Sequence, residues 1–175
     1  MSFVDDYKES MLFEFNRNKT MAEKTFDQLT NEDLHWTYGE ADNSIAIIVK
    51  HMVGNMLSRW TNFFTEDGEK EWRNRESEFV APYQNKEEML LHWNKGWDCL
   101  FTAIDNINED NFNTKIKIRA VEHSVMAAVS RQLAHYAGHI AQIAYVGRML
   151  KGKKWQSLSI PAGKSEEFNK KMFGK

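Results

Sequence analysis

Residues 131–148, RQLAHYAGHIAQIAYVGR, carry the pattern that decides the fold class. Apolar side chains recur here at spacings of three and four residues, which is the periodicity of one face of an α-helix. The pattern continues on both sides and predicts a helix over about 124–150, which the Lys-Gly-Lys-Lys run at 151–154 ends.

Two histidines give this predicted helix its chemical interest. His135 and His139 lie four residues apart, so their side chains project from one face, one turn apart, and could share a metal ion. The same spacing occurs in the H-E-x-x-H motif of zinc enzymes, but Tyr136 stands where that motif has its catalytic Glu, so a zinc-protease mechanism has no support. The competing interpretation of each ring is a core imidazole bonded to a carbonyl or carboxylate.

The surroundings of the pair favour a buried position. The same face continues through Ala128, Gln132, Gln142 and Val146, so we expect the two rings to face the interior of the fold. Gly138 lies between them and costs a helix roughly 1 kcal/mol relative to Ala, so it either permits close approach of a neighbouring element or is incidental.

A second apolar segment, residues 45–64 (IAIIVKHMVGNMLSRWTNFF), carries another inward-facing histidine. It is apolar around much of its circumference, which predicts a central helix over about 44–64. If this helix neighbours the last one, His51 can join His135 and His139 in binding one ion, with other coordination positions open to water or substrate.

Two more amphipathic segments complete the predicted architecture. Apolar spacings near three and four residues predict helices over about 3–29 and 86–107, and both prolines, Pro82 and Pro161, fall outside all predicted helices. The sequence therefore predicts an all-α fold, a four-helix bundle with long crossover loops, in a single domain that spans 1–175.

The connecting segments are predicted as follows. Residues 30–33 form a polar connection, and the charged stretch 66–85 forms a structured loop. The segment between the last two helices is a crossover, whose extended piece at 116–119 is too short to define a sheet. In the tail, 151–175, we expect Trp155, Leu158 and Ile160 to pack back on the bundle and a short helix to follow Ser165.

Composition excludes several classes of function. The formal net charge is −2 and basic residues form no long stripe, so nucleic acid is not an expected partner. No segment approaches the roughly 20 apolar residues that span a bilayer, and the first residues do not resemble a signal peptide, so we expect a cytoplasmic protein without a membrane segment. Cys99 is the only cysteine, which excludes an internal disulfide and indicates packing.

Two stretches resemble the motifs of the DinB-like (YfiT-like) family of metal-dependent helical bundles. These are NSIAIIVKHMVGN (43–55) around His51, and RQLAHYAGHIAQIAYVGR around His135 and His139, in which Gln142 matches the Gln after the last family His. The resemblance covers nearly the whole chain. It implies a four-helix bundle with non-sequential helix order, a divalent ion on these histidines, with nickel or zinc foremost, and a homodimer.

Other parts of the chain refine the resemblance. The segments DGEKEWRNRESEF (67–79) and WQSLSIPAGKSEEFN (155–169) resemble a subgroup of small bacterial proteins whose activity is unassigned. Many relatives have Arg directly after the last His, where this chain has Ile140, so any role of that Arg does not carry over.

The resemblance makes activation of a low-molecular-weight thiol for S-transfer the leading functional hypothesis. A metal with three neutral His ligands keeps its 2+ charge and lowers the pKa of a bound water or thiol. Some relatives are thiol S-transferases. Lys70, Arg73 and Arg75 in the charged loop could hold a carboxylate of such a thiol, the alternative being that they are simply solvated.

Three other hypotheses remain open. A metal-dependent hydrolase needs a general base, and Glu78 and Glu122 are only weak candidates, so no catalytic residue is assigned. A non-enzymatic, stress-related metal-binding protein would use the ion for stability or sensing. An interaction protein would use exposed aromatics, such as Trp72 and Trp155, to dimerise.

Overall fold

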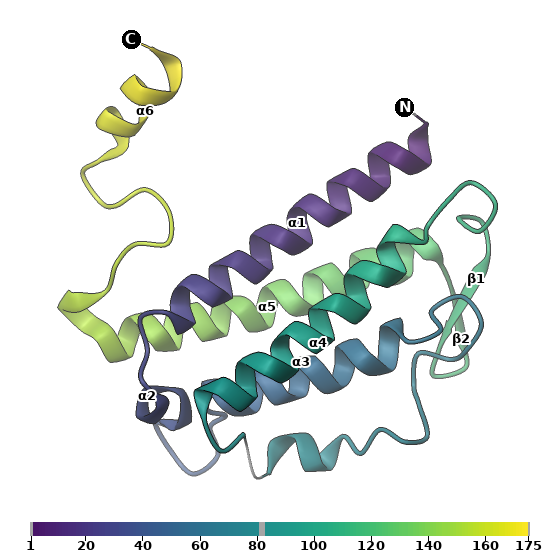
Figure 1. Cartoon of the computed structure of the whole chain (residues 1–175), viewed down its shortest axis with the longest axis horizontal. Helices are drawn as coiled ribbons and strands as arrows, with labels where there is room; N and C mark the ends of the chain where they lie inside the picture. The colour runs from purple at the N-terminus through teal and green to yellow at the C-terminus, as the bar shows by residue number, and fades with distance from the viewer. Residues whose placement is uncertain (1, 81–82, 175) are drawn as a thin grey trace.

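The computed structural model describes residues 2–80 and 83–174, and this part of the chain is mostly helical (Figure 1). The four long helices are α1 (Phe3–Phe26), α3 (Ile45–Trp60), α4 (Lys86–Asp105) and α5 (Val125–Lys151). The shorter elements are α2 (Asn31–His35), η1 (Glu76–Phe79), β1 (Lys115–Ile118), β2 (Val121–Ser124), η2 (Gly152–Lys154) and α6 (Ser165–Phe173). No helix in the described ranges combines the length and apolarity that crossing a membrane requires.

The long helices share one apolar core. α3 packs on α4 and α1 packs on α5, while contacts between α1 and α4 and between α3 and α5 join the two pairs (Figure 1). Phe15 of α1 lies in the core, with its ring centroid 6.1 Å from that of Trp60, 6.3 Å from that of Trp97 and 6.3 Å from that of Tyr136. Aromatic pairs at such distances add about 0.5–1.5 kcal/mol each beyond the burial of their surface.

Each long helix begins at a polar side chain that caps it. The oxygens of these capping side chains accept a hydrogen bond from the backbone N–H three residues later, which satisfies a donor that the helix leaves free. The capping residues are Ser2, Ser44, Asn85 and Ser124. The starts of the helices are therefore encoded locally and lie close to their predicted positions.

The first helix is shorter than the sequence predicts. α1 ends at Phe26 instead of near Leu29, because the N–H groups of Gln28 and Leu29 bond to carbonyls only three residues back, which tightens the chain into a turn. Thr30 then caps α2, with its side chain accepting from Asp33 N at 3.2 Å. The predicted polar connection thus contains a short helix.

The second long helix is also shorter than predicted. α3 ends at Trp60 instead of near residue 64, because Thr61 is extended (ψ 125°) and Asn62 has a positive φ of 50°. The following apolar residue Phe63 stays buried although it is no longer helical. The apolar pattern therefore correctly indicates that this side chain is buried, but it does not show that the backbone is no longer helical there.

The crossover between α4 and α5 contains a β-hairpin, which corrects the prediction of an extended piece too short to define a sheet. β1 and β2 pair antiparallel, with Ile118 opposite Val121. The two turn residues, Arg119 and Ala120, both have positive φ, 55° and 62°, as in a type I′ turn. The carboxylate of Asp67 accepts from both of their N–H groups, at 2.8 and 2.7 Å, and fixes the turn against the loop after α3.

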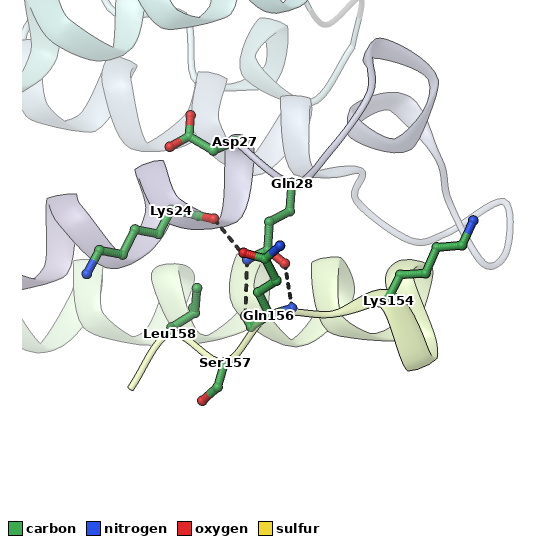
Figure 2. A pocket seen from close by; sticks show the side chains of 7 residues that line it. All are labelled: Lys24, Asp27, Gln28, Lys154, Gln156, Ser157 and Leu158. Carbon is green, nitrogen blue, oxygen red and sulfur yellow. Dashed lines mark hydrogen bonds between the residues drawn. The ribbon is translucent and has the colours of Figure 1, made fainter. Parts of the chain in front are cut away.

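The segment after α5 leaves the other helices. Gln156 makes two hydrogen bonds with Gln28, which follows α1 (Figure 2). The backbone N–H of Gln156 donates to the side-chain oxygen of Gln28 at 2.8 Å, and the side-chain Nε2 of Gln28 donates to the backbone carbonyl of Gln156 at 3.2 Å. α6, the helix predicted after Ser165, stands apart from the four long helices in Figure 1. The tail is therefore anchored at its beginning. Of the residues predicted to pack back on the helices, Trp155 is half-buried beside Gly147 of α5 and Leu158 is half-buried, while Ile160 is exposed.

Candidate metal centre

Three histidine rings from two helices meet beside η1. α3 contributes His51, and α5 contributes His135 and His139. One ring nitrogen of each lies within 4.8 Å of the others. The ring centroid of His139 is 5.0 Å from that of His51 and 4.7 Å from that of His135. The contact between α3 and α5 thus brings together residues more than eighty positions apart in the chain.

Hydrogen bonds at Nδ1 fix the position of the proton on two of these rings. Nδ1 of His51 lies 2.9 Å from the Glu78 carboxylate, and Nδ1 of His139 lies 2.9 Å from the side-chain oxygen of Gln142. Both oxygens are acceptors, so each Nδ1 carries the proton and each Nε2 presents a lone pair. A carboxylate or amide behind the ring is the usual partner of a metal-binding histidine, since it fixes the tautomer and the orientation.

The chemistry of the donor set fits a divalent ion. The Nε2 atoms of His135 and His139 lie 3.1 Å apart. Two nitrogens on one tetrahedral zinc, each at about 2.0–2.1 Å, are separated by roughly 3.3 Å. Because the His139 Nε2 bears a lone pair, the facing Nε2 of His135 either donates a proton to it or shares a cation with it. Three neutral imidazoles suit zinc, nickel, copper or iron.

The environment keeps the two α5 histidines neutral. Burial, helped by the charges of His139 and His51, lowers the pKa of His135 to about 4. Burial also lowers the pKa of His139, although its hydrogen bond with Gln142 acts in the opposite direction. Metal binding requires unprotonated rings, so neither histidine has to give up a proton at neutral pH.

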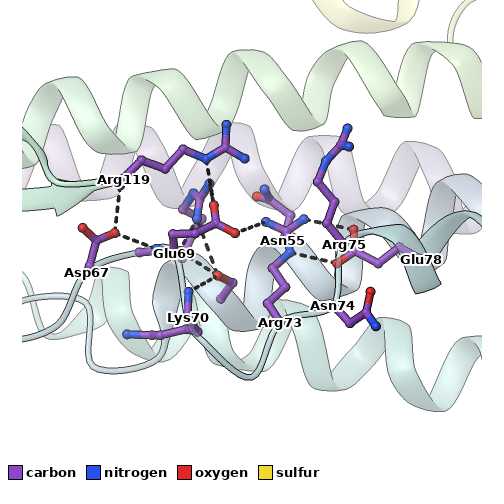
Figure 3. A network of polar contacts seen from close by, with 12 residues as sticks. Asn55, Asp67, Glu69, Lys70, Arg73, Asn74, Arg75, Glu78 and Arg119 are labelled. Carbon is purple, nitrogen blue, oxygen red and sulfur yellow. Dashed lines mark hydrogen bonds and ion pairs between the residues drawn. The ribbon is translucent and has the colours of Figure 1, made fainter.

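Glu78 connects the centre to a buried arginine (Figure 3). Arg73 donates from Nε to one Glu78 oxygen at 2.8 Å and from Nη2 to the other at 3.0 Å. Burial alone would raise the pKa of the Glu78 carboxyl, but the hydrogen bonds from His51 and Arg73 outweigh it, so the pKa is lowered. Glu78 is thus an ionised partner of His51. With its oxygens engaged on both sides, it is poorly placed to act as a general base.

Gly54 gives the Glu78 carboxylate its place against α3. A Cβ atom at residue 54 would lie 2.2 Å from Oε1 of Glu78 and 2.8 Å from its Cδ. Such distances are far below van der Waals contact, so only glycine allows this approach. Gly138, which the sequence analysis singled out for the same purpose, has no neighbour within 4 Å of its built Cβ in the described part of the chain. The close approach therefore occurs on α3 and not on α5.

The histidines of α5 lie at the edge of the core, which corrects the expectation that they face the interior. Both are half-buried, while Tyr136 and Ile140, one position further along in each case, are fully buried. Successive residues differ by about 100° around a helix, so the face that carries the two histidines is rotated from the core face by that angle. One face of α5 thus carries the two histidines, and a different face, with Tyr136 and Ile140, packs in the core.

A buried polar network fixes the relative position of α3 and α5 next to the rings. The Asn55 carbonyl accepts from Gln132 Nε2 at 2.6 Å and from the Tyr136 hydroxyl at 2.9 Å. Trp60 Nε1 donates to the same hydroxyl at 3.1 Å. Since Asn55 lies one turn after His51 and Tyr136 follows His135, the network sets the distance between the rings. In the sequence, Gln132 is recognisable only as part of a helix face.

The three loop residues predicted to bind substrate have different surroundings. Arg73 and Arg75 line a cavity of about 630 Å³ that also reaches His51 and His135. Lys70 is buried elsewhere, and its ammonium group pairs with Glu66 at 2.7 Å. The structure thus brings two of the three toward the histidines.

The remaining candidates lie away from the rings. Glu122 is exposed on β2, Trp72 is exposed in the charged loop, and Trp155 is half-buried near Gly147. Cys99 is half-buried, with its thiol 3.5 Å from the Thr61 hydroxyl. None of these four lines the cavity beside the histidines.

Comparison with known proteins places this chain in a family. Residues 2–164 match the family described as "Protein of unknown function (DUF1572)", and the chain belongs to that family. No curated protein and no solved structure matches it significantly. The family assignment spans all three histidines and the charged loop, and it ends before α6.

Proposed function

We propose that this protein is a DinB-like helical bundle that binds one divalent metal ion through His51, His135 and His139. The observation that carries the proposal is the convergence of three ring nitrogens within 4.8 Å, in rings that come from two helices. The hydrogen bonds of His51 to Glu78 and of His139 to Gln142 add support, since they turn a lone pair of each ring toward the common point.

We further propose that the protein is a metal-dependent enzyme that activates a low-molecular-weight thiol for S-transfer. A divalent ion held by three neutral imidazoles keeps its charge and favours the thiolate form of a bound thiol at neutral pH. In the overall reaction a C–S bond forms at an electrophilic carbon, the leaving group departs with its electron pair, and the thiol proton goes to solvent. The protein's own residues position the reactants: the cavity beside His51 and His135 offers room for a small molecule.

The engagement of Glu78 separates this proposal from the hydrolase alternative. Hydrolysis needs a base that can accept a proton from water. The nearest buried carboxylate is Glu78, and it is held by His51 and by both nitrogens of the Arg73 fork. A reaction of a thiol depends less on a general base, because a thiol loses its proton far more readily than water does.

Elemental analysis of untagged protein, purified without added metal, tests the metal site. We expect near-stoichiometric nickel or zinc in the wild type and its loss in His51→Ala and His139→Ala, with circular dichroism showing that both variants remain helical. His92→Ala is the matched control, since His92 lies outside the cluster and stacks on Tyr83. Equal metal content in the wild type and both cluster variants would refute the proposal.

Thiol-dependent consumption of an electrophile tests the enzymatic part. We expect turnover in the wild type with a panel of small thiols and none in the folded His135→Ala variant. Metal binding without turnover across the panel would leave a non-enzymatic metal-binding protein as the better description. Light scattering after size exclusion tests the homodimer that the family resemblance implies.

A further inference from the structure

Five arginines line the cavity beside the histidine cluster. They come from four separate parts of the chain: α3, the loop before η1, the hairpin turn and α5. These arginines are Arg59, Arg73, Arg75, Arg119 and Arg131, and the other lining residues are His51, Asn55, Ala134 and His135. No carboxylate is among the described lining residues. Such a concentration of positive charge is notable in a chain whose formal net charge is −2.

Two carboxylates that pair with these arginines, Glu69 and Glu78, neutralise only part of this charge (Figure 3). Glu69 pairs with Arg59 at 3.1 Å and with Arg119 at 2.9 Å. Glu78 pairs with Arg73 at 2.8 Å. Two negative groups thus serve three guanidinium groups, two of which, Arg59 and Arg73, have nearly fully buried side chains.

The other two arginines have weaker partners. The nearest carboxylate to Arg75 is that of Glu76, at 3.5 Å, and both side chains are largely exposed, so this pair is screened by water. Arg75 also lies over the Phe79 ring, 5.0 Å from its centroid, and lines the cavity. Arg131 donates to the neutral amide oxygen of Gln132 at 2.8 Å.

The hairpin turn holds Arg119 at the cavity in an uncommon backbone conformation. Both turn residues have positive φ although neither is glycine or asparagine, the residues that such a turn favours. The hydrogen bonds that the N–H groups of these two residues donate to the Asp67 carboxylate stabilise this conformation. A non-glycine residue held at positive φ suggests that its side chain serves a purpose there.

From this arrangement we propose that the cavity binds a small dianion, the phosphate or paired carboxylate group of a small-molecule substrate, through Arg75, Arg119 and Arg131. Guanidinium groups form bidentate, charge-assisted hydrogen bonds with both kinds of anion. Arg59 and Arg73, whose side chains are nearly fully buried and held by carboxylates, contribute positive potential from the wall. Arg119 shares Glu69 with Arg59, but its side chain is 59% exposed and can also contact the anion. A volume of about 630 Å³ suits a metabolite and not a macromolecule. This inference deepens the proposed function, because the anion would lie beside the metal.

Isothermal titration calorimetry of the full chain, freed of metal by a chelator, tests the inference. Inorganic phosphate and succinate are titrated separately at constant ionic strength, with chloride as the reference anion. We expect at least one dianion to bind about tenfold or more tightly than chloride, and Arg75→Ala and Arg131→Ala each to weaken it by about tenfold. Tighter phosphate binding identifies a phosphate monoester as the natural group, and tighter succinate binding identifies a dicarboxylate.

Arg17→Ala is the matched control, since Arg17 is an exposed arginine on α1 that pairs with Glu14 and does not line the cavity. We expect it to bind the dianion as the wild type does. Binding no tighter than that of chloride, or binding that survives the Arg75→Ala/Arg131→Ala double substitution, overturns the inference. Because these titrations use metal-free protein, they fail or succeed independently of the metal analysis of the histidine variants.

Discussion

The α1–α4 side of the molecule and the α3–α5 side bury very different residues. Where α1 meets α4, the buried contacts are mainly aromatic, as in the edge-to-face pair of Phe26 and Trp93 at 5.3 Å, and the polar contacts lie at the edge, where Trp93 donates to Glu23 and Lys86 to the Phe26 carbonyl. Where α3 meets α5, the contacts include the hydrogen bond from Gln132 to Asn55 and the cluster of histidine rings. Burying polar groups costs free energy unless every one of them is paired. The α3–α5 side therefore contributes less to the stability of the fold, for the same buried area, than an apolar interface would.

The difference separates residues that stabilise the protein from those that build its site. On the apolar side, volume and shape decide how well the helices pack. On the polar side, each group is held by a specific partner, and the partners lead from the core to the cavity. We therefore expect substitutions on the two sides to affect different measurements.

The largest effect is expected from Phe26→Ala on the apolar side. Phe26 is 1% exposed, and its removal leaves a cavity against Trp93 that should lower the free energy of unfolding by about 3–5 kcal/mol. Chemical denaturation measures this loss. The metal content of the folded fraction should not change, and a joint loss of metal and stability would remove the distinction between the two sides.

Gly54→Ala should have its main effect on metal binding. The new Cβ would displace the Glu78 carboxylate, so His51 loses the partner that orients its ring. Loss of such a partner typically weakens metal affinity by about 10–100-fold. Competition with a chromogenic chelator measures the affinity. Wild-type affinity in this variant would show that Glu78 does not orient the ring.

The pH dependence of stability is expected to reflect the polar side. The folded pKa of His135 is about 4, below the ordinary value of 6.5, so the unfolded chain takes up a proton that the folded chain does not. This stabilising contribution is complete above pH 6.5 and is lost as the pH falls toward 4. Thermal unfolding of metal-free protein should therefore depend more steeply on pH in this window for the wild type than for His135→Gln. Parallel curves would contradict this.

The smallest effect is expected from Gly138→Ala, which is the counterpart of Gly54→Ala on the other helix. Its added methyl group meets no described atom within 4 Å, and alanine favours the helix, so stability should rise by about 0.5–1 kcal/mol. Metal affinity should stay at the wild-type value although the residue lies next to His139. A loss of metal affinity would mean that close approach at α5 matters after all.

The sequence by itself determined where the four long helices begin and that each of them has an apolar face. Apolar periodicity, polar caps and the glycine after α5 act within a few residues, so they can be read from the chain. The proximity of His135 and His139 can also be predicted from the sequence, because residues four apart in a helix lie on the same face. The apolar pattern failed at the end of α3, since it reports burial and not backbone conformation.

Only the tertiary structure decided what surrounds the histidines. The packing of α3 on α5 brings His51 to the pair, and η1, in the segment between α3 and α4, places Glu78 next to the His51 ring. The five arginines gather because the loop, the hairpin and two helices converge, and no periodicity in the chain relates them. Long-range convergence of charged groups depends on how packed elements are placed in space, and a linear pattern of residue types does not contain that information.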